Sequence, residues 1–363
     1  MSNSNLHNAK VAKNDEFYTQ YEDIENEMNA YLEYDPDLFR DKTILCPCDD
    51  PEFSNFTRYF AAKFEMLGIK KLISTSYARN SKNYGSGTQV SLFELNSPQY
   101  DENKTDTHGK IFILDRDTDD SGHIDIDDLR WEYLEGDGDF RSDEVSVLRD
   151  ECDFIITNPP FSLFREVIAW IVEGGKQFAF IGSMNAITYK EIFPLIKNNI
   201  IWLGVTAPKE FIQPDKEIKK FGNIYWFTNI EHGRRHRPMM LMNTKDNIKY
   251  SRHKEIRGIG YQHYDNYDAI EVPYCDAIPS DYDGVMGVPI SWLDKYCPEQ
   301  FEIIGLDRYT IPKEFLVGGR AAIKGKPTYA RILIRYTDSW KKQHPQEFPE
   351  YARAGGGEDN EEK

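Results

Sequence analysis

Short apolar runs alternate with amphipathic stretches from about residue 40 to residue 230. The runs have the length of buried strands and occupy residues 42–47, 69–77, 153–157, 176–182, 200–205 and 223–229. Between them, apolar side chains recur every three to four residues within 53–67 and 163–172, which predicts helices with one apolar face, and a further helix is expected near 188–198. Strands that alternate with helices are typical of βαβ units, so we predict an α/β fold built on a mostly parallel sheet.

The pattern changes twice along the chain. Residues 78–109 are rich in Asn, Ser, Gly and Asp and interrupt the strands, so we expect a long loop or insertion there. Beyond residue 231 the periodicity weakens, while tyrosines, prolines, glycines and basic residues become frequent. We therefore predict a larger domain over residues 1–230, a smaller and less regular domain over 231–340, and a disordered tail over 341–363.

Composition places the chain among folded proteins. Hydrophobic residues make up 40% and aromatic residues 13%, which excludes a mostly disordered or collagen-like chain. No apolar run approaches the roughly 18 residues that a membrane helix needs, and the N-terminal residues lack the apolar core of a signal peptide. We therefore expect a cytoplasmic protein with no membrane partner, whose five cysteines are reduced thiols.

Charge is distributed unevenly along the chain. The net charge of −17 disfavours a polyanionic partner, because nucleic-acid binding depends on Lys and Arg side chains. Residues 101–155, however, hold 19 acidic against 6 basic residues, so one segment carries most of the imbalance. Residues 232–257 hold 8 basic against 2 acidic residues, which is typical either of a solvated face or of a surface that contacts phosphates.

The four residues Asn158, Pro159, Pro160 and Phe161 directly follow the strand predicted at 153–157. In open α/β sheets, ligands bind at the carboxyl ends of the strands. Two prolines remove backbone donors and stiffen the turn, so it presents hydrogen-bond acceptors. The Asn158 amide oxygen and the Pro159 carbonyl can accept both hydrogens of a planar amino group, while Phe161 stacks on the ring that carries it.

Four ordered stretches resemble the EcoRI-type family of DNA adenine-N6 methyltransferases. They are KNDEFYTQYEDIENEM at 13–28, CPCDDPEFSNFTRYF at 46–60, GDGDFRSDE at 136–144 and NPPFSLF at 158–164. The resemblance implies a Rossmann-like methyltransferase sheet with helices on both faces and a smaller, irregular C-terminal target-recognition region. It also implies S-adenosylmethionine as methyl donor and double-stranded DNA as partner, within a restriction-modification setting or as a separate enzyme.

The resemblance also implies which residues form the site. It makes Asn158, Pro159, Pro160 and Phe161 the catalytic motif. It implies cofactor contacts by Phe17, Tyr18 and Thr19, by Asp49, Asp50 and Pro51, and by Asp137, Asp139 and Phe140. The usual Gly-rich cofactor loop is absent, and Asp49-Asp50-Pro51 stand in its place. Either Asp49 or Asp50 suits the ammonium group of the cofactor, and either Asp137 or Asp139 suits its adenosine end.

A base inside a duplex cannot reach such a pocket, so the resemblance implies that the target adenine is flipped out of the helix. Methyl transfer is then a direct in-line attack without a covalent intermediate. The basic segment offers candidates for phosphate or guanine contacts. These DNA-binding candidates are Arg234, Arg235, Arg237, Lys249, Arg252, Lys254 and Arg257. The sequence specifies neither the recognised DNA site nor the oligomeric state.

Other functions fit the same motifs. RNA adenines and protein glutamines also offer planar amino groups, so a methyltransferase for either acceptor is an alternative. A catalytically silent DNA-binding protein that keeps the fold is a third. Residues 117–128 match an EF-hand-like calcium loop at Asp117, Asp119, Ser121 and Gly122. Asp128 replaces the bidentate Glu of such loops, so we predict no metal.

Overall fold

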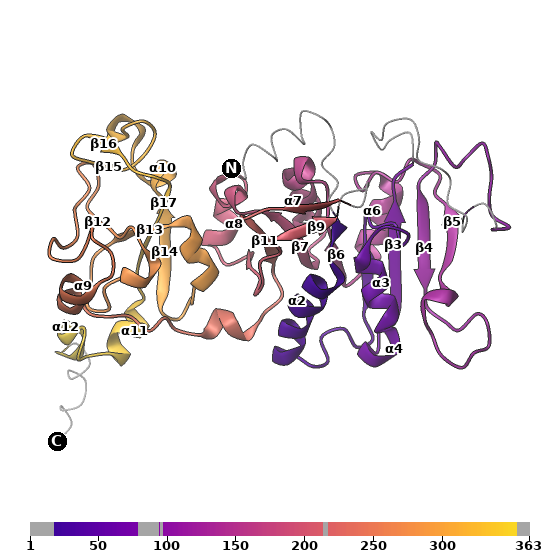
Figure 1. Cartoon of the computed structure of the whole chain (residues 1–363), viewed down its shortest axis with the longest axis horizontal. Helices are drawn as coiled ribbons and strands as arrows, with labels where there is room; N and C mark the ends of the chain where they lie inside the picture. The colour runs from indigo at the N-terminus through magenta and orange to yellow at the C-terminus, as the bar shows by residue number, and fades with distance from the viewer. Residues whose placement is uncertain (1–17, 79–93, 95–96, 213–216, 354–363) are drawn as a thin grey trace, which may run out of the picture. The chain divides into compact units, whose positions relative to one another are not determined.

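A computed structural model describes residues 18–78, 94, 97–212 and 217–353 (Figure 1). The chain forms two compact units. Unit 1 comprises Met1–Asn185 and Ile201–His232, and unit 2 comprises Ala186–Ile200 and Gly233–Lys363. This division places residues 186–200, which we had assigned to the first domain, with unit 2, where the helix α8 (Phe193–Lys197) packs against β14 (Phe301–Leu306).

An eight-stranded mixed sheet forms the centre of unit 1. Its strand order is β5-β4-β3-β2-β6-β7-β11-β8. The strands are β2 (Thr43–Cys46), β3 (Lys71–Ser76), β4 (Lys110–Leu114), β5 (Arg130–Tyr133), β6 (Phe154–Thr157), β7 (Gln177–Ser183), β8 (Trp202–Leu203) and β11 (Ile224–Thr228). The six strands expected from the apolar runs are thus confirmed, although β8 is reduced to two residues.

The sheet is less parallel than predicted. Only the four central strands, β3, β2, β6 and β7, run parallel to one another. The strands on both flanks, β4 and β5 on one side and β11 and β8 on the other, pair antiparallel. The strands β4 and β5 were not predicted, because they lie within or next to a stretch dominated by acidic and polar residues. β4 pairs along its whole length with β3, so this acidic region extends the sheet rather than forming only a loop.

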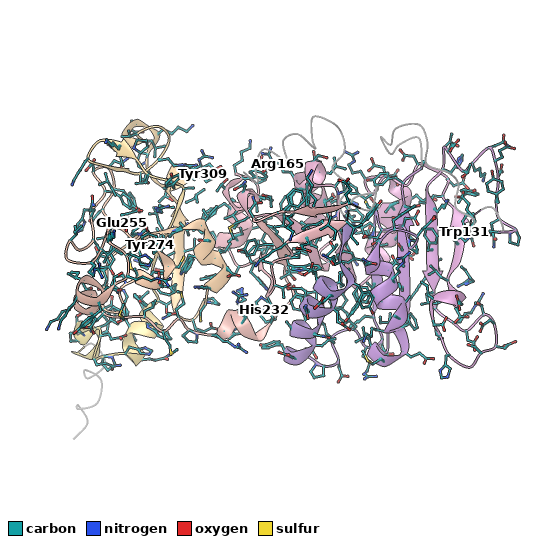
Figure 2. All side chains as sticks on the ribbon, viewed as in Figure 1. Trp131, Arg165, His232, Glu255, Tyr274 and Tyr309 are labelled. Carbon is teal, nitrogen blue, oxygen red and sulfur yellow. The ribbon has the colours of Figure 1, made fainter. Side chains whose placement is uncertain are left out.

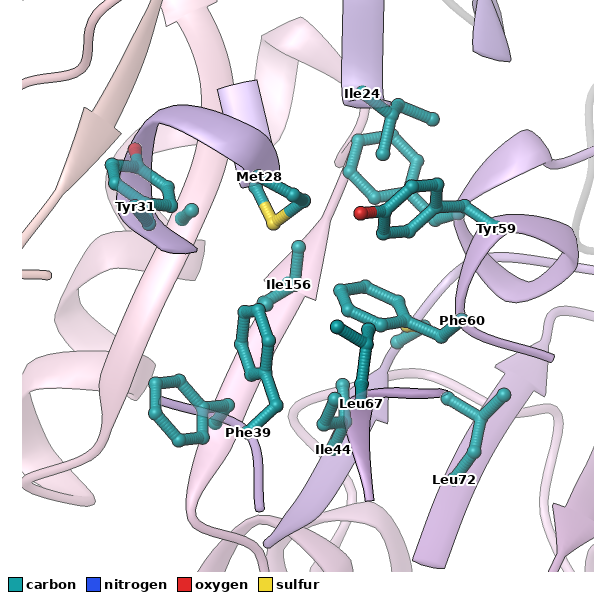
Figure 3. Packing of buried hydrophobic residues seen from close by; sticks show 14 of the residues in the cluster. Ile24, Met28, Tyr31, Phe39, Ile44, Tyr59, Phe60, Leu67, Leu72 and Ile156 are labelled. Carbon is teal, nitrogen blue, oxygen red and sulfur yellow. The ribbon is translucent and has the colours of Figure 1, made fainter. Parts of the chain in front are cut away.

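Helices cover both faces of the sheet. They are α2 (Tyr21–Tyr34), α3 (Asn55–Ala62), α4 (Phe64–Leu67), α6 (Asp143–Glu151) and α7 (Phe164–Glu173). Figure 3 shows Met28 of α2 and Phe60 of α3 near Ile44 and Ile156. The side chains of Ile44 and Ile156 point to the same face of the sheet. On the other face, Phe164 of α7 packs against Phe180 and Phe227.

A small antiparallel sheet joins distant parts of unit 1. Its strand order is β1-β9-β10, formed by β1 (Tyr18–Thr19), β9 (Glu210–Ile212) and β10 (Ile218–Lys220). Thr19 pairs with Phe211 and Tyr18 with Ile212. This sheet brings the N-terminal motif beside a segment almost 200 residues further along the chain.

Unit 2 is more regular than the weak periodicity beyond residue 231 suggests. It contains a sheet of order β12-β13-β17-β14 and a separate hairpin, β15-β16. Its strands are β12 (Ile270–Glu271), β13 (Met286–Pro289), β14, β15 (Ala322–Ile323), β16 (Lys326–Pro327) and β17 (Arg331–Tyr336). Besides α8, its helices are α9 (Thr244–Tyr250), α10 (Asp307–Thr310), α11 (Asp338–Gln343) and α12 (Pro349–Arg353).

Part of the segment predicted as a disordered tail is folded. Residues 341–353 include the end of α11 and all of α12, and Lys341 is buried with its ammonium group paired to Asp283. Their charged and polar composition resembles that of a tail, but the Lys341 contacts tie them to the unit. Residues 354–363 lie outside the described part of the chain.

Candidate active site

The site is built where β2 and β6 end. The two strands are parallel neighbours, with Ile44 paired to Phe154 and Leu45 to Ile155. Their carboxyl ends therefore lie at the same edge of the sheet. The Asp49-Asp50-Pro51 segment follows β2, and the NPPF turn, residues 158–161, follows β6, so the sheet brings together two motifs that are more than 100 residues apart.

Asp49 connects the two strand ends. Its side chain is 2% exposed. The Ser54 hydroxyl donates to Asp49 Oδ1 at 2.6 Å, and Thr157 Oγ1 lies 2.6 Å from Oδ2. The backbone N–H of Asn158 also donates to this carboxyl group. The catalytic candidate Asn158 is therefore held in place through its own backbone and through the preceding Thr157.

Burial without a cation raises the pKa of Asp49 to about 7, despite hydrogen bonds from Ser54, Thr157 and Asn158 that favour the charged form. The hydrogen-bond geometry agrees with a protonated acid. Thr157 has one hydroxyl proton but contacts two oxygens, Asp49 Oδ2 and the Pro47 carbonyl. When Thr157 donates to Pro47, a proton on Asp49 can complete the second hydrogen bond.

Asp50 and Pro51 occupy a different environment. Asp50 is half-buried, and its Oδ1 accepts from the backbone N–H of Glu52 at 2.9 Å. The Pro51 carbonyl accepts from Arg58 Nε at 2.9 Å. The structure thus separates the two neighbouring acids: Asp49 faces inward and organises the strand ends, while Asp50 lies toward solvent.

The NPPF turn leads into a short 3₁₀ turn and then α7. Asn158 and Pro160 are half-buried and Pro159 is buried. The Phe161 ring packs edge-on against Phe211 and Phe221, with ring centroids 6.2 Å apart in both cases. Phe161 is therefore anchored to the β1-β9-β10 sheet.

The N-terminal motif lies beside the same strand ends. The Asn55 amide donates to the Thr19 carbonyl at 2.8 Å, and Tyr18 stacks on Phe53. Thr19 is 1% exposed, and its hydroxyl has no hydrogen-bond partner among the described residues. A buried, unpartnered hydroxyl is unfavourable, so this atom is suited to a ligand contact. Phe17 lies outside the described residues.

The loop 136–140 closes against the end of β3. The Ala78 N–H donates to the Asp137 carbonyl at 2.8 Å. Gly138 has a φ of +82°, and a Cβ there would lie 2.3 Å from the Ser76 carbonyl oxygen. Only glycine satisfies both the backbone conformation and this close approach. The sequence motif GDGDF is therefore fixed at the same edge as the loops after β2 and β6.

The acidic residues of this loop differ in role. Asp137 is exposed and its Oδ1 accepts from the Asp139 N–H at 3.1 Å. Asp139 forms a bidentate pair with Arg141, with contacts of 2.9 and 2.5 Å, and the Arg141 side chain lowers the pKa of Asp139. Phe140 is buried and packs edge-on against Trp170, so it stabilises the loop from within.

The predicted DNA contacts divide into two groups, all in unit 2. Arg234 pairs with Asp294 at 2.7 Å, Arg252 pairs with Asp276 at 2.8 Å, and Arg235 is 7% exposed and donates to the Asn199 side chain. These three arginines contribute to the unit's own structure. Arg252 is nevertheless exposed. The remaining four are exposed and form no ion pair with a described carboxylate; we call them the exposed basic set: Arg237, Lys249, Lys254 and Arg257. Figure 2 marks Glu255, which lies in the sequence between the last two.

The calcium-like motif forms a compact acidic loop. The carboxylates of Asp117, Asp119 and Asp128 have oxygens within 4.8 Å of one another. Asp117 accepts from the Gly122 N–H, and Asp128 accepts from the Thr118 and Asp125 N–H groups. These carboxylates are occupied by the loop's own backbone, which lowers the pKa of Asp117 and of Asp128.

Sequence reasoning missed the Thr157 and Ser74 hydroxyl groups that, together with that of Ser54, organise the site. Thr157, Ser54 and Ser74 all hydrogen-bond to Asp49 or its carbonyl. Their signal was present, because Ser74 and Thr157 are polar residues within otherwise apolar strands. Such residues must find buried partners, and a buried aspartate at a strand end is a suitable one.

An α/β sheet whose strand ends bring together Tyr18-Thr19, a buried aspartate, a GDGDF loop and an NPPF turn fits a methyltransferase. The chain belongs to the adenine-specific methyltransferase EcoRI family, whose model matches residues 5–337.

Sequence similarity to individual proteins supports the same assignment. The chain is 40% identical over 352 residues to the Type II methyltransferase M.EcoRI of Escherichia coli, covering 92% of this chain and 97% of that protein. It is 32% identical over 358 residues to the Type II methyltransferase M.MpnI of Mycoplasma pneumoniae, covering 90% and 96%. No solved structure matches the chain. Within the described residues, every helix is too short or too polar to cross a membrane.

Proposed function

We propose that the protein transfers a methyl group from S-adenosylmethionine to the N6 amino group of a specific adenine in double-stranded DNA. The observation that carries this proposal is the NPPF turn, held at the end of β6 by Asp49 through Thr157 and the Asn158 N–H. Membership of an adenine-specific methyltransferase family, and relatives named as Type II methyltransferases, support DNA rather than RNA or protein as acceptor.

The residues at the strand ends fit the proposed cofactor. S-adenosylmethionine supplies an electrophilic methyl group on a sulfonium, and it carries an ammonium, a carboxylate and a ribose diol. The Thr19 hydroxyl, buried and without a described partner, suits one polar group of such a ligand. Asp49, Asp50, Asp137 and Asp139 provide acceptors for the ammonium and the diol. Gly138 lets the backbone of the 136–140 loop approach β3 closely.

The chain's own residues then position the acceptor. The Asn158 amide oxygen and the Pro159 carbonyl accept the two hydrogens of the target amino group, which leaves its nitrogen lone pair directed toward the methyl donor. The anchoring of Phe161 by Phe211 and Phe221 stiffens the turn that presents these acceptors. Preorganised acceptors of this kind reduce the reorganisation that the reaction requires.

The acceptor base must leave the duplex to reach the turn, so we include base flipping in the proposal. The exposed basic set, Arg237, Lys249, Lys254 and Arg257, supplies phosphate contacts. Arg234 and Arg235 act indirectly by maintaining the structure of unit 2, because Arg234 is paired with Asp294 and Arg235 is buried. Arg252 is paired with Asp276, but its side chain is exposed and can also reach a phosphate.

The test is to incubate the protein with unmethylated DNA and isotopically labelled S-adenosylmethionine, then to analyse the nucleosides. We expect label in N6-methyladenine. The variant Asn158→Ala should lose at least about 10²-fold in rate while it retains its unfolding midpoint. Asn103→Ala, on an exposed loop, is the matched control and should retain full activity.

Other outcomes point elsewhere. If DNA stays unlabelled and RNA or protein glutamine takes up label when offered in its place, then RNA or protein, and not DNA, is the acceptor. Absence of both label and cofactor binding would favour a silent DNA-binding protein. Full activity in Asn158→Ala would reject the proposed role of the NPPF turn.

A further inference from the structure

Two consecutive tight turns project from unit 2 within residues 313–329, here called the hairpin segment. In the first, Val317 and Arg320 form a β-bridge around Gly318 and Gly319, with φ of +56° and +76°. In the second, β15 and β16 pair around Lys324 and Gly325, with φ of +51° and +72°. Positive φ at both central positions is typical of type I′ hairpin turns.

Lys324 is an unusual residue for its position. The first central position of a type I′ turn favours Asn, Asp or Gly, because other side chains are strained in the left-handed region. The chain instead places an exposed lysine at the tip. Backbone strain at an exposed site without structural benefit indicates a functional contact.

Asp265 and Asn266 hold both turns by hydrogen bonds. Asp265 Oδ2 accepts from the Gly325 N–H at 2.7 Å, and Asn266 Oδ1 accepts from the Ala322 N–H at 2.9 Å. The Asn266 amide also donates to the Phe315 carbonyl at 2.8 Å. The hairpin segment is thus preorganised, so little conformational entropy is lost when it binds a partner.

The segment presents cations and aromatic rings together. Lys313, Lys324 and Lys326 are exposed, and no carboxylate of the described residues pairs with them. Tyr329 is 84% exposed and Phe315 is 59% exposed. A single exposed aromatic residue is ordinary, but two rings among three lysines in 17 residues are typical of surfaces that bind nucleic acid.

The hairpin segment is separate from the basic residues already assigned. Figure 1 shows β15 and β16 toward one end of unit 2 and α9, which carries Lys249, toward the other. Tyr309, marked in Figure 2, precedes the segment and donates to the Thr188 carbonyl at 2.9 Å, so the segment's beginning is tied to the unit.

We propose that the hairpin segment is a second DNA-contacting element, distinct from the exposed basic set. Lys313, Lys324 and Lys326 contact phosphates, and Tyr329 and Phe315 pack on sugars or exposed base faces. The partner is the duplex that carries the target adenine, so this inference rests on the proposed function. Because the overall charge of −17 opposes binding of a polyanion, contact with DNA has to be made through locally unpaired cations such as these.

The test measures DNA affinity against salt for the full-length protein and the triple variant Lys313→Gln, Lys324→Asn, Lys326→Gln. Asn is used at 324 because it tolerates the left-handed backbone. Each lost phosphate contact lowers the slope of log affinity against log salt by about 0.9, so the slope should fall by roughly 2 to 3 with long mixed-sequence duplex DNA. The matched control replaces Lys70, Lys197 and Lys342, which are also exposed, by Gln.

A second variant tests the rings independently. Tyr329→Ala removes a side chain that is almost entirely in solvent, so folding is unaffected, and affinity should fall about 5-fold or more. If the triple variant keeps the salt slope of its control and Tyr329→Ala keeps wild-type affinity while the wild type methylates DNA, the inference fails and the proposed function stands. If the wild type neither binds nor methylates DNA, both fail.

Discussion

Both units bury carboxylates, and Glu271 of unit 2 and Asp49 of unit 1 are stabilised in different ways. In unit 2, Glu271 of β12 receives a bidentate contact from Arg331 of β17, and the Tyr264 hydroxyl also donates to it. In unit 1, the donors to Asp49 among the described residues are hydroxyl and N–H groups. One carboxylate is therefore compensated by a permanent cation, and the other is stabilised in part by a proton.

These two carboxylates also differ in their position in the fold. The Glu271–Arg331 pair joins two strands of one sheet and is complete in itself. Asp49 lies where three candidate site motifs meet, and it keeps a pKa near neutrality. A carboxylate without a protein cation at a strand end is the environment that a positively charged ligand favours.

The largest expected effect comes from breaking the unit 2 pair. Arg331→Met leaves Glu271 buried without a cation, so we expect the free energy of unfolding to fall by about 3–5 kcal/mol in denaturant titration. The control is Arg335→Met on the same strand, because the Arg335–Glu302 pair is exposed and its loss should change stability by less than about 1 kcal/mol. Equal losses in both variants would contradict this comparison.

The next effect concerns the close packing on which the unit 1 site depends. Gly138→Ala combines left-handed backbone strain with a clash against the Ser76 carbonyl, so a loss of about 2–4 kcal/mol is expected. Gly136→Ala is the control, since a Cβ there meets only Glu144 Oε2 at 3.8 Å. Thermal unfolding should leave the Gly136 variant close to wild type; a similar shift in both would rule out the proposed tight contact.

Asp49 itself should make stability depend on pH. Its folded pKa of about 7 lies above the ordinary value of 3.8, so the folded state retains a proton that the unfolded chain releases, and stability falls as pH rises between these values. Asp49→Asn removes this dependence. The difference in free energy of unfolding between the variant and the wild type should therefore shift in favour of the variant by roughly 2–3 kcal/mol from pH 5 to pH 8.

The comparison between the two proteins at each pH cancels all other titrating groups. Denaturant unfolding at several pH values therefore measures the Asp49 contribution alone. Parallel stability profiles for wild type and Asp49→Asn would show that the buried carboxyl stays charged throughout, as it would beside a cation.

The smallest effect tests the unpartnered hydroxyl of the site. Thr19→Val replaces a buried hydroxyl that has no described partner, so stability should rise by up to about 1 kcal/mol, whereas binding of S-adenosylmethionine should weaken several-fold. Thr157→Val is the matched variant, because Thr157 has two oxygen neighbours and should lose about 1–3 kcal/mol. Calorimetric binding together with unfolding distinguishes them; unchanged cofactor affinity in Thr19→Val would remove Thr19 from the binding site.

The sequence predicts the strands and helices that have clear periodicity. The runs 42–47 and 153–157 became β2 and β6, and their parallel pairing brings Asp49 and Asn158 to one edge. The sequence does not predict β4 and β5, because their short apolar stretches stand among many acidic residues. Strand pairing with β3, a tertiary contact, decides their conformation.

The sequence indicates which motifs gather at the strand ends but not how their side chains are arranged. Motif spacing could indicate Asp49 and Asp50 but could not tell which faces inward, since both follow the same strand. Nor could charge counting distinguish Arg235, which is buried, from Arg237, which is exposed. These distinctions depend on partners such as Thr157 and Asn199 that lie far away in the sequence.

The path of the chain between the units affects how the protein can fold during synthesis. Helix α8 emerges from the ribosome before unit 1 has received its last strands, and its partner β14 follows about 100 residues later. At ordinary elongation rates, roughly 5–20 s pass between the synthesis of α8, which carries Phe193 and Ile196, and the synthesis of β14, against which α8 packs. During that interval the nascent chain exposes an apolar helix that chaperones can bind and that can aggregate at high expression.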